Sequence, residues 1–263
     1  MSIQIILVFV LNFIISLIGT LAYSVRLVGI RTGKIAVSFA LFNILMLVSR
    51  IAVTFQVPIL TKHVERTSGS GDLLALFNAI ILISGVATIL GALLIPTFQK
   101  ILCKGVESFS ADRSLSKLIL HSFSKAGIRY MKECVSVPGK EYVRQLSYGR
   151  LPKRIIAANV VAVALITVGS LAPIYAGAIE PDLRMTCVTL SSIVNGIATI
   201  LMTILIDPKL SIMTDDVIDG KCTEEEFRLC VIGLVGSKTL GTFAAVLLLV
   251  PFSYLIVIIA NII

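Results

Sequence analysis

Six long apolar runs constrain this chain more than any other feature of its sequence. Each has at least about 20 residues, the length that a helix needs to cross a hydrocarbon core of about 30 Å. The chain is 57% hydrophobic and 14% charged, whereas a soluble domain has about 45–50% apolar and about 25% charged residues. The sequence therefore predicts an all-α, polytopic membrane protein with a single transmembrane domain, whose spans lie near residues 3–23, 35–60, 73–98, 155–178, 185–206 and 236–262.

The basic residues predict how the chain is oriented in the membrane. Segments 24–34, 99–154 and 207–235 would lie on one side, and they hold 18 of the 23 Lys and Arg residues. The segments on the opposite side hold three, which are Lys62, Arg66 and Arg184. Because cytoplasmic loops carry the excess of Lys and Arg, we expect both termini to lie outside and the protein to be a multi-pass protein of the cytoplasmic membrane.

The basic segment 99–154 is the one large region between the predicted spans, and we expect it to be cytoplasmic. Residues 113–132 have the pattern of an amphipathic helix, with basic side chains on one arc and apolar side chains on the other. Such a helix is suited to the inner membrane interface, where anionic headgroups attract its charged face. It would either capture an anionic lipid headgroup or simply anchor the segment.

The sequence lacks the motifs of several other functional classes. Its five cysteines are scattered, and neither His63 nor His121 lies beside a cysteine, so we expect no metal site, disulfide framework or cofactor. No phosphate-binding glycine loop or catalytic triad can be assembled. The net charge of +8 lies beside the spans, which indicates lipid contact and membrane orientation rather than a nucleic-acid partner.

The acidic segment 207–228 has two interpretations. Asp215, Asp219 and Glu226 match three ligand positions of a calcium-binding EF-hand loop, but Val217 stands where an oxygen ligand is required. Thr223 and Glu226 also have the spacing of a helix capping box before an apolar run. The capping interpretation is favoured.

Arg50 is the most informative polar residue within the spans. A guanidinium at the middle of a span costs about 2.5–3.5 kcal/mol on insertion scales, and no span contains an acidic residue that would neutralise it. At helical spacing Asn43, Arg50, Thr54 and Thr61 share a face, which we expect to point into the bundle or into a water-filled cavity. Arg50 would therefore bind a transient anion such as a phosphate, or else act as structural glue by donating to helix-end carbonyls.

Other polar positions suggest packing and a repeat. Ser192, Asn195, Thr199 and Thr203 form a stripe in the fifth run, and small polar residues of this kind usually let helices pack closely. Lys238 is expected near the inner end of the last span, where its ammonium can reach the interface, and it is a secondary candidate for the site. Three spans that start outside are followed by three that start inside, and inverted repeats place substrate sites at their interface.

Two blocks of sequence carry a resemblance to a known family. The first holds IGTLAYSVR at 18–26, RTGKIAV at 31–37, FALFN at 39–43 and SR at 49–50, and it ends near residue 62. The second runs from DPK at 207–209 to TDDVIDGK at 214–221. With these blocks the chain resembles the Amj family, the alternate lipid II flippases of Gram-positive bacteria, over essentially its whole length.

The resemblance implies movement of an undecaprenyl-pyrophosphate-linked peptidoglycan precursor, lipid II or a similar polyprenyl-pyrophosphate lipid, from the inner to the outer leaflet. Charge and depth then give each polar residue an expected role. Three basic residues would gather the diphosphate at the inner face, one would hold it at mid-depth beside three hydrogen-bonding side chains, and one would receive it near the outer face. In that order they are Arg26, Arg31 and Lys34; Arg50; Asn43, Asn195 and Thr199; and Lys62.

Several alternatives stay open at this point. Six helices enclose little room for a sugar-peptide headgroup, so a homo-oligomer or a half-open groove is expected. Because the spans hold no Asp or Glu, a potential-driven or passive mechanism is as well supported as proton exchange. The chain could instead be a membrane-embedded enzyme that uses Asp215, Asp216 and Asp219, or a scaffold of a cell-wall complex that transports nothing.

Overall fold

The computed structural model describes residues 3–67, 70–112, 129, 133–135 and 153–263. Throughout these ranges the regular structure is helical, with no strand, and six helices are long and apolar enough to cross a membrane. The expected all-α, polytopic fold is therefore confirmed. The predicted amphipathic helix at 113–132 lies outside the described residues, except for Arg129, which forms an ion pair with Glu133 at 3.3 Å.

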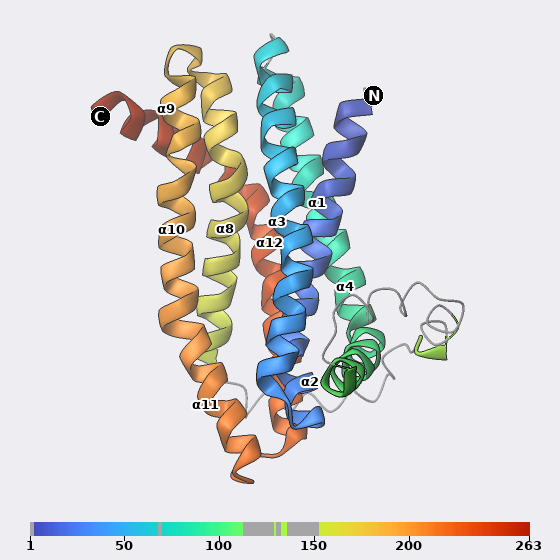
Figure 1. Ribbon diagram of the computed structural model, residues 1–263. Helices are drawn as coiled ribbons and strands as arrows, with labels where there is room; N and C mark the ends of the chain where they lie inside the picture. The colour runs from blue at the N-terminus through green and yellow to red at the C-terminus, as the bar shows by residue number, and fades with distance from the viewer. Residues whose placement is uncertain (1–2, 68–69, 113–128, 130–132, 136–152) are drawn as a thin grey trace.

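The first half of the chain forms three long helical segments (Figure 1). A short 3-10 turn joins α1 to α2, so that the two form one apolar helical segment that ends at Gly33. Gly33 has φ 67°, a left-handed conformation that ends a helix and lets the chain reverse. The elements are α1 (Ile3–Leu21), η1 (Ala22–Ser24), α2 (Val25–Thr32), α3 (Ile35–Arg66) and α4 (Ser70–Asp112).

The second half forms three more such segments. Its middle segment is built from consecutive short helices and includes a π-helical turn, a feature often found at functional sites. The elements are α8 (Lys153–Ile179), η2 (Pro181–Leu183), α9 (Arg184–Thr189), α10 (Ser191–Leu201), the π-turn η3 (Met202–Ile206), α11 (Asp207–Ile218) and α12 (Glu224–Ile262).

The predicted capping box at the start of α12 is confirmed. The Thr223 side chain accepts a hydrogen bond from the Glu226 backbone N–H at 3.2 Å, and the Glu226 carboxylate accepts one from the Thr223 backbone N–H at 3.1 Å. These bonds satisfy backbone donors that a helix leaves unpaired at its N-terminus.

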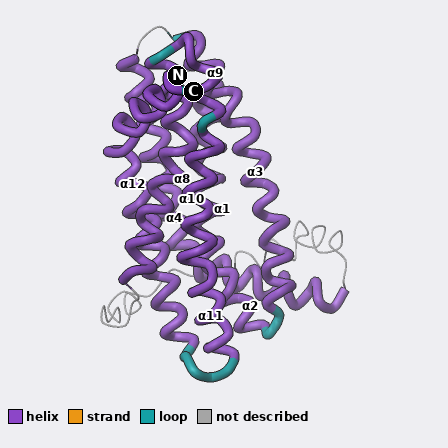
Figure 2. The backbone as a smooth tube through the Cα atoms, turned by 90° about the vertical axis from the view of Figure 1, so that its left-hand side faces the viewer, coloured by secondary structure: helices purple, strands orange, loops and turns teal. Residues whose placement is uncertain are grey.

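The two chain termini lie at the same end of the bundle, here called the termini end (Figures 1 and 2). The opposite end, here called the loop end, carries the turn at Gly33 and the loop at 219–223 between α11 and α12. Arg31, Lys34 and Lys221 lie at the loop end. The positive-inside rule predicts that this end faces the cytoplasm.

Two helices extend well beyond the expected spans. α4 has 43 residues and continues past residue 98; in Figure 1 its last part lies across the loop end, beyond Pro96. α12 begins at Glu224, twelve residues before the expected span at 236. Near the termini end, where Pro251 interrupts the backbone hydrogen bonds, α12 runs at an angle to the bundle (Figure 1). Hydropathy marks the apolar part of a helix and not the turns that flank it.

Packing is closest within each half and apolar between the halves at the termini end. α1 packs most extensively against α4, and α8 against α12. The α8–α12 contact depends on Gly241, because a Cβ there would lie 2.6 Å from the Val160 carbonyl oxygen. At the termini end the halves meet in an apolar cluster that includes Phe77 of α4 and Tyr175 of α8, whose rings pack edge to face at 5.5 Å.

Candidate functional site

A cavity of about 540 Å³ lies between the two halves. Its walls come from α1, α2, α3 and α4 on one side and from α8, η3, α11 and α12 on the other. Asn43 and Val53 of α3 and Ser170 of α8 line it and are nevertheless exposed. The cavity therefore opens to the surface of the bundle between α3 and α8, on the side where α3 stands apart in Figure 2.

Arg26 of α2 and Asp207 of α11 line the cavity at its loop end. The Arg26 guanidinium lies 3.8 Å from an Asp207 carboxylate oxygen, donates to the Ser211 hydroxyl at 3.0 Å, and stacks over the Phe39 ring at 5.2 Å. These contacts join the first half of the chain to α11. They also show that Asp207, the acidic residue among those lining the cavity, already has a cationic partner.

Lys238 of α12 also lines the cavity and reaches across it to α1. Its ammonium donates to the Ser16 carbonyl at 3.4 Å and lies 5.8 Å from the centre of the Tyr23 ring. Gly19 leaves it room, because a Cβ at that position would lie 3.0 Å from the nitrogen. Lys238 makes no ion pair with any residue that the structure describes.

Lys238 was expected near the inner end of the last span, with its ammonium free to reach the interface, whereas the structure directs the ammonium at α1. Since α12 begins at Glu224, Lys238 lies 14 residues, or about 21 Å, along the helix. Its ammonium is directed at the backbone of α1 inside the cavity.

A fully buried asparagine links the two halves next to Lys238. The Asn159 amide of α8 donates to the Leu234 carbonyl at 3.0 Å and to the Ser237 hydroxyl at 2.7 Å, both on α12. Its amide oxygen accepts a hydrogen bond from the Tyr23 hydroxyl at 3.0 Å. This network fixes the Tyr23 ring against which Lys238 lies. Sequence reasoning missed Asn159, because a single asparagine in an apolar run forms no stripe.

Asn12 occupies a matching position in the first half. Its amide donates to the Ile80 carbonyl at 2.9 Å and to the Ser84 hydroxyl at 2.6 Å, both on α4, and its oxygen accepts from the Gln56 amide at 3.3 Å. In each half, therefore, an asparagine of the first long helix bonds to a carbonyl and a serine of the last one. Because α1 runs toward the loop end and α8 toward the termini end, this shared arrangement has opposite directions in the two halves, as a six-span topology requires.

Arg50 lies at the rim of the cavity rather than inside it. Its side chain is exposed and makes no hydrogen bond or ion pair with any described residue. Asn43 and Val57, seven residues before and after it, both line the cavity, and residues seven apart share a helix face. The expectation that this face points into a cavity is correct for Asn43 and wrong for Arg50 and Thr54, because α3 lies at the edge of the bundle and exposes both side chains.

The remaining predicted residues lie apart from the cavity. Arg31 forms an ion pair with Glu224 of α12 at 2.6 Å and donates to Gln99 of α4 at 3.2 Å, so it joins three helices at the loop end. Lys34 is exposed beside the turn at Gly33, and Lys62 is exposed at the other end of α3. Of the eight predicted residues, Arg26 and Asn43 line the cavity.

Asn195 belongs to the contact between α10 and α8, whereas Thr199 is exposed and bonds within its own helix. The Asn195 amide approaches the Gly169 carbonyl of α8 at 3.5 Å, and the Thr199 hydroxyl donates to the Asn195 carbonyl at 2.8 Å. A Cβ at Gly169 would lie 2.7 Å from the Asn195 amide oxygen. The geometry matches the helix-packing interpretation at Asn195, whereas Ser192, Thr199 and Thr203 are exposed.

Comparison with known proteins shows the family. A family model described as Amj, alternate to MurJ, matches residues 11–260. The chain belongs to the Amj family. A curated member, Lipid II flippase Amj of Bacillus subtilis (strain 168), is 33% identical to it over 257 residues, which cover 96% of this chain and 95% of that relative. No solved structure matches the chain.

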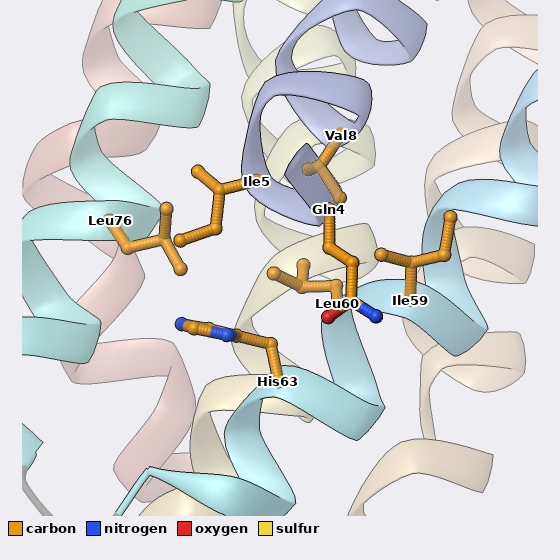
Figure 3. Close-up of a pocket in the computed structure, with 7 residues that line it drawn as sticks. All are labelled: Gln4, Ile5, Val8, Ile59, Leu60, His63 and Leu76. Carbon is orange, nitrogen blue, oxygen red and sulfur yellow. The ribbon is translucent and has the colours of Figure 1, made fainter. Parts of the chain in front are cut away.

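The Amj match covers both halves, so the cavity, Lys238 and the two asparagine clusters all lie within the region that defines the family. The resemblance found from the sequence is thus confirmed. A second, much smaller depression in this Amj protein lies at the termini end between α1, α3 and α4, with Gln4 and His63 at its edge (Figure 3). It has no room for a water-sized sphere and holds no ligand-sized space.

Proposed function

We propose that this protein is a lipid II flippase, which moves undecaprenyl-pyrophosphate-linked peptidoglycan precursor from the inner to the outer leaflet of the cytoplasmic membrane. Its membership of the Amj family and its identity to a relative of that name support the cargo. The observation that carries the proposal is the open cavity at the interface of two inverted halves, the place where transporters built from such repeats bind their substrates.

The cavity suits an amphiphilic anion. Its walls are mainly apolar but carry the cations Arg26 and Lys238, so a diphosphate can leave water without losing all its electrostatic partners. The lateral opening beside α3 lets the prenyl chain stay in the lipid while the polar end enters. At about 540 Å³ the cavity has the size typical of a small-molecule site, so the sugars and peptide extend through the opening.

Arg26, Asn43 and Arg50 remain the proposed substrate contacts among the residues selected from the sequence. Arg26 lies at the loop end of the cavity, Asn43 in its wall, and Arg50 at its rim. Arg31 and Lys34 would attract the anionic headgroup to the loop end, and Lys62 would meet it at the termini end. For Asn195 the hydrogen bond to Gly169 supports a packing role instead. Thr199 is exposed outside the cavity and bonds within its own helix.

The two asparagine clusters suggest how the halves move. Each cluster holds the first and last long helix of one half together, so each half can move as a unit. The halves meet through the Tyr23–Asn159 hydrogen bond toward the loop end and through the apolar Phe77–Tyr175 contact at the termini end. Opening one contact while the other stays closed would expose the cavity to one leaflet at a time.

The enzymatic alternative gains no support from the acidic segment. Asp219 forms an ion pair with Lys221 at 2.8 Å, and the backbone carbonyls of Asp215 and Asp216 accept the hydrogen bonds that end α11. None of these three aspartates lines the cavity. The segment therefore serves to end one helix and to start the next, and transport is the proposed activity.

The test is flipping of a lipid-II-type substrate by the purified protein in liposomes. Ser170→Trp fills the cavity from an exposed wall position, whereas Val161→Trp places the same ring on an exposed face of α8 outside the cavity. We expect Ser170→Trp to slow flipping by about tenfold or more, which corresponds to about 1.4 kcal/mol in the barrier, and Val161→Trp to behave like wild type. Wild-type protein that flips no faster than empty liposomes would contradict the proposed function.

A further inference from the structure

We propose that the Lys238 ammonium binds a phosphate group of the transported lipid inside the cavity, as the second cation that the lipid meets after Arg26. The inference rests on the proposed function and adds a binding residue to it. Lys238 was expected to extend to the membrane interface, and its place in the cavity follows from the structure alone.

The first argument is the incomplete set of partners around the ammonium. A lysine ammonium has three donors, and among the described residues Lys238 has one acceptor, the Ser16 carbonyl at 3.4 Å. The Tyr23 ring at 5.8 Å adds a weak cation–π contact. No carboxylate pairs with Lys238 within the described part of the chain. An enclosed ammonium with so few partners is costly, and an anion that enters the cavity would complete its shell.

The second argument is the charge of the cavity as a whole. Its charged lining residues are Arg26, Lys238 and Asp207, and Asp207 already lies 3.8 Å from Arg26. The excess positive charge therefore belongs to Lys238. A low-dielectric wall strengthens the attraction between this charge and an entering anion, and the lipid diphosphate carries the matching charge.

The third argument is position. The Lys238 ammonium lies beside Gly19, seven residues before Arg26 on the same helical segment. The two cations therefore follow one another about two helical turns, or about 10 Å, apart along the cavity. The Asn159 bond fixes the Tyr23 ring, and Gly19 keeps the space beside the ammonium free of a side chain. A diphosphate that moves along the cavity can thus contact Arg26 first and Lys238 next.

The inference is tested by measuring how tightly farnesyl diphosphate, a short prenyl diphosphate, binds to the purified full-length protein in detergent. Lys238→Met keeps the length of the side chain and removes the charge, and we expect the Kd to rise about tenfold to a hundredfold. Lys238→Arg should retain most of the affinity because the charge remains. Lys209→Met, at an exposed lysine of α11 outside the cavity, is the matched control and should bind like wild type.

Competition identifies the source of the phosphate. Inorganic pyrophosphate and phosphatidylglycerol micelles are each added in excess over farnesyl diphosphate. Displacement by neither assigns the site to a prenyl diphosphate, as proposed. Equal displacement by phosphatidylglycerol would make Lys238 a site for any lipid phosphate and overturn the assignment to the cargo, and displacement by pyrophosphate alone would make it a site for a soluble anion.

A second measurement needs no variant and so does not depend on folding of Lys238→Met. Acetic anhydride modifies exposed amines, and mass spectrometry follows each lysine of the wild-type protein. Farnesyl diphosphate should slow acetylation of Lys238 severalfold and leave Lys209 unchanged. No protection of Lys238, together with equal binding by a folded Lys238→Met, would show that Lys238 merely links α12 to Ser16.

The outcomes separate this inference from the proposed function. If wild type and Lys238→Met flip the lipid-II-type substrate equally well in liposomes, the flippase stands and the role of Lys238 falls. If the wild-type protein binds farnesyl diphosphate but does not flip the substrate, and Lys238→Met abolishes the binding, the site is supported and the proposed transport activity is contradicted.

Discussion

Arg50 of α3 and Lys238 of α12 are the two charged residues within the six predicted spans, and the structure treats them in opposite ways. Arg50 is exposed at the rim of the cavity, without a partner among the described residues. Lys238 lies inside the cavity, with its ammonium directed across to α1. The sequence favoured Arg50 because of its depth. Depth along a span does not show which way a side chain points.

The difference comes from how the two helices are packed. α12 packs extensively against α8 and also against α4, so one of its faces is central and Lys238 lies on it. α3 packs mainly against α1 and α2 and leaves a long face exposed, with Leu47, Ile51 and Phe55 beside Arg50. A guanidinium on such a face must reach water or a lipid phosphate, whereas the ammonium of Lys238 meets only what enters the cavity.

Charge reversal at the two positions gives the largest expected effect. Lys238→Glu places a second carboxylate in the cavity with Asp207, so we expect it to lower the liposome flipping rate by about a hundredfold or more, equivalent to about 2.7 kcal/mol. Arg50→Glu, at the rim, should lower it by about tenfold, because water and headgroups screen its charge. Lys209→Glu, exposed on α11, controls for net charge. A greater loss of flipping rate with Arg50→Glu than with Lys238→Glu would show that Arg50, and not Lys238, is the more important cation.

How much of this contrast the sequence could predict depends on the range of the interactions. The helical class, the six apolar segments and the cap at Thr223 depend on residues close together in the chain, and all were predicted. The environment of Lys238 depends on Ser16, 222 residues away, and the Tyr23–Asn159 bond joins residues 136 apart. No local pattern encodes such pairs, because they exist only after the two halves have packed.

The same limit applies to the candidate site. Arg26 could be selected because its charge follows directly after an apolar run, and Asn43 because it interrupts one. Asn12 and Asn159 also interrupt apolar runs, but their partners are a carbonyl and a serine on helices that follow more than 60 residues later. Their matching geometry in the two halves becomes visible only as structure, since the halves share no evident sequence.

Asn159 offers an intermediate test, because it holds the wall of the cavity on which Lys238 depends. Asn159→Leu removes an acceptor from the Tyr23 hydroxyl and a donor from the Leu234 carbonyl and Ser237 hydroxyl. We expect the free energy of unfolding in detergent to fall by about 1–3 kcal/mol, the cost of leaving buried polar groups unpaired, and Tm to fall with it. Asn12→Leu should have a similar effect.

Asn195→Leu is the matched control, since Asn195 is half-buried and makes one long hydrogen bond of 3.5 Å. Its effect on Tm should be smaller than that of either cluster. If Asn159→Leu weakens farnesyl diphosphate binding and Arg50→Leu does not, the result supports binding inside the cavity beside Lys238 and not at the rim beside Arg50. Equal Tm values for all three asparagine variants would show that the two clusters do not hold the first and last long helices of each half together.

The smallest expected effect is on the labelling of Cys222, and it leaves transport unchanged. It tests which side of the membrane the loop end faces, and therefore whether Arg26 or Lys238 lies nearer the cytoplasm. Cys222 lies half-buried in the loop at 219–223, outside the predicted spans. Burial, together with a hydrogen bond to the Glu226 carboxylate at 3.4 Å, raises the pKa of its thiol above the usual value. Because the thiolate is the reactive form, maleimide labelling should be slow at neutral pH and become faster as the pH rises.

With both termini outside, a membrane-impermeant maleimide should label Cys222 only after the cells are permeabilised, and Cys222→Ser should remove that signal. The loop end of the cavity, which holds Arg26, would then lie nearer the cytoplasm, and a diphosphate entering from the inner leaflet would meet Arg26 first and Lys238 next. Labelling of Cys222 in intact cells would show that the loop end faces outward and the termini face the cytoplasm. Lys62 would then lie at the side of entry, and Arg26 and Lys238 would act when the lipid is released, so the same two cations would serve the opposite step.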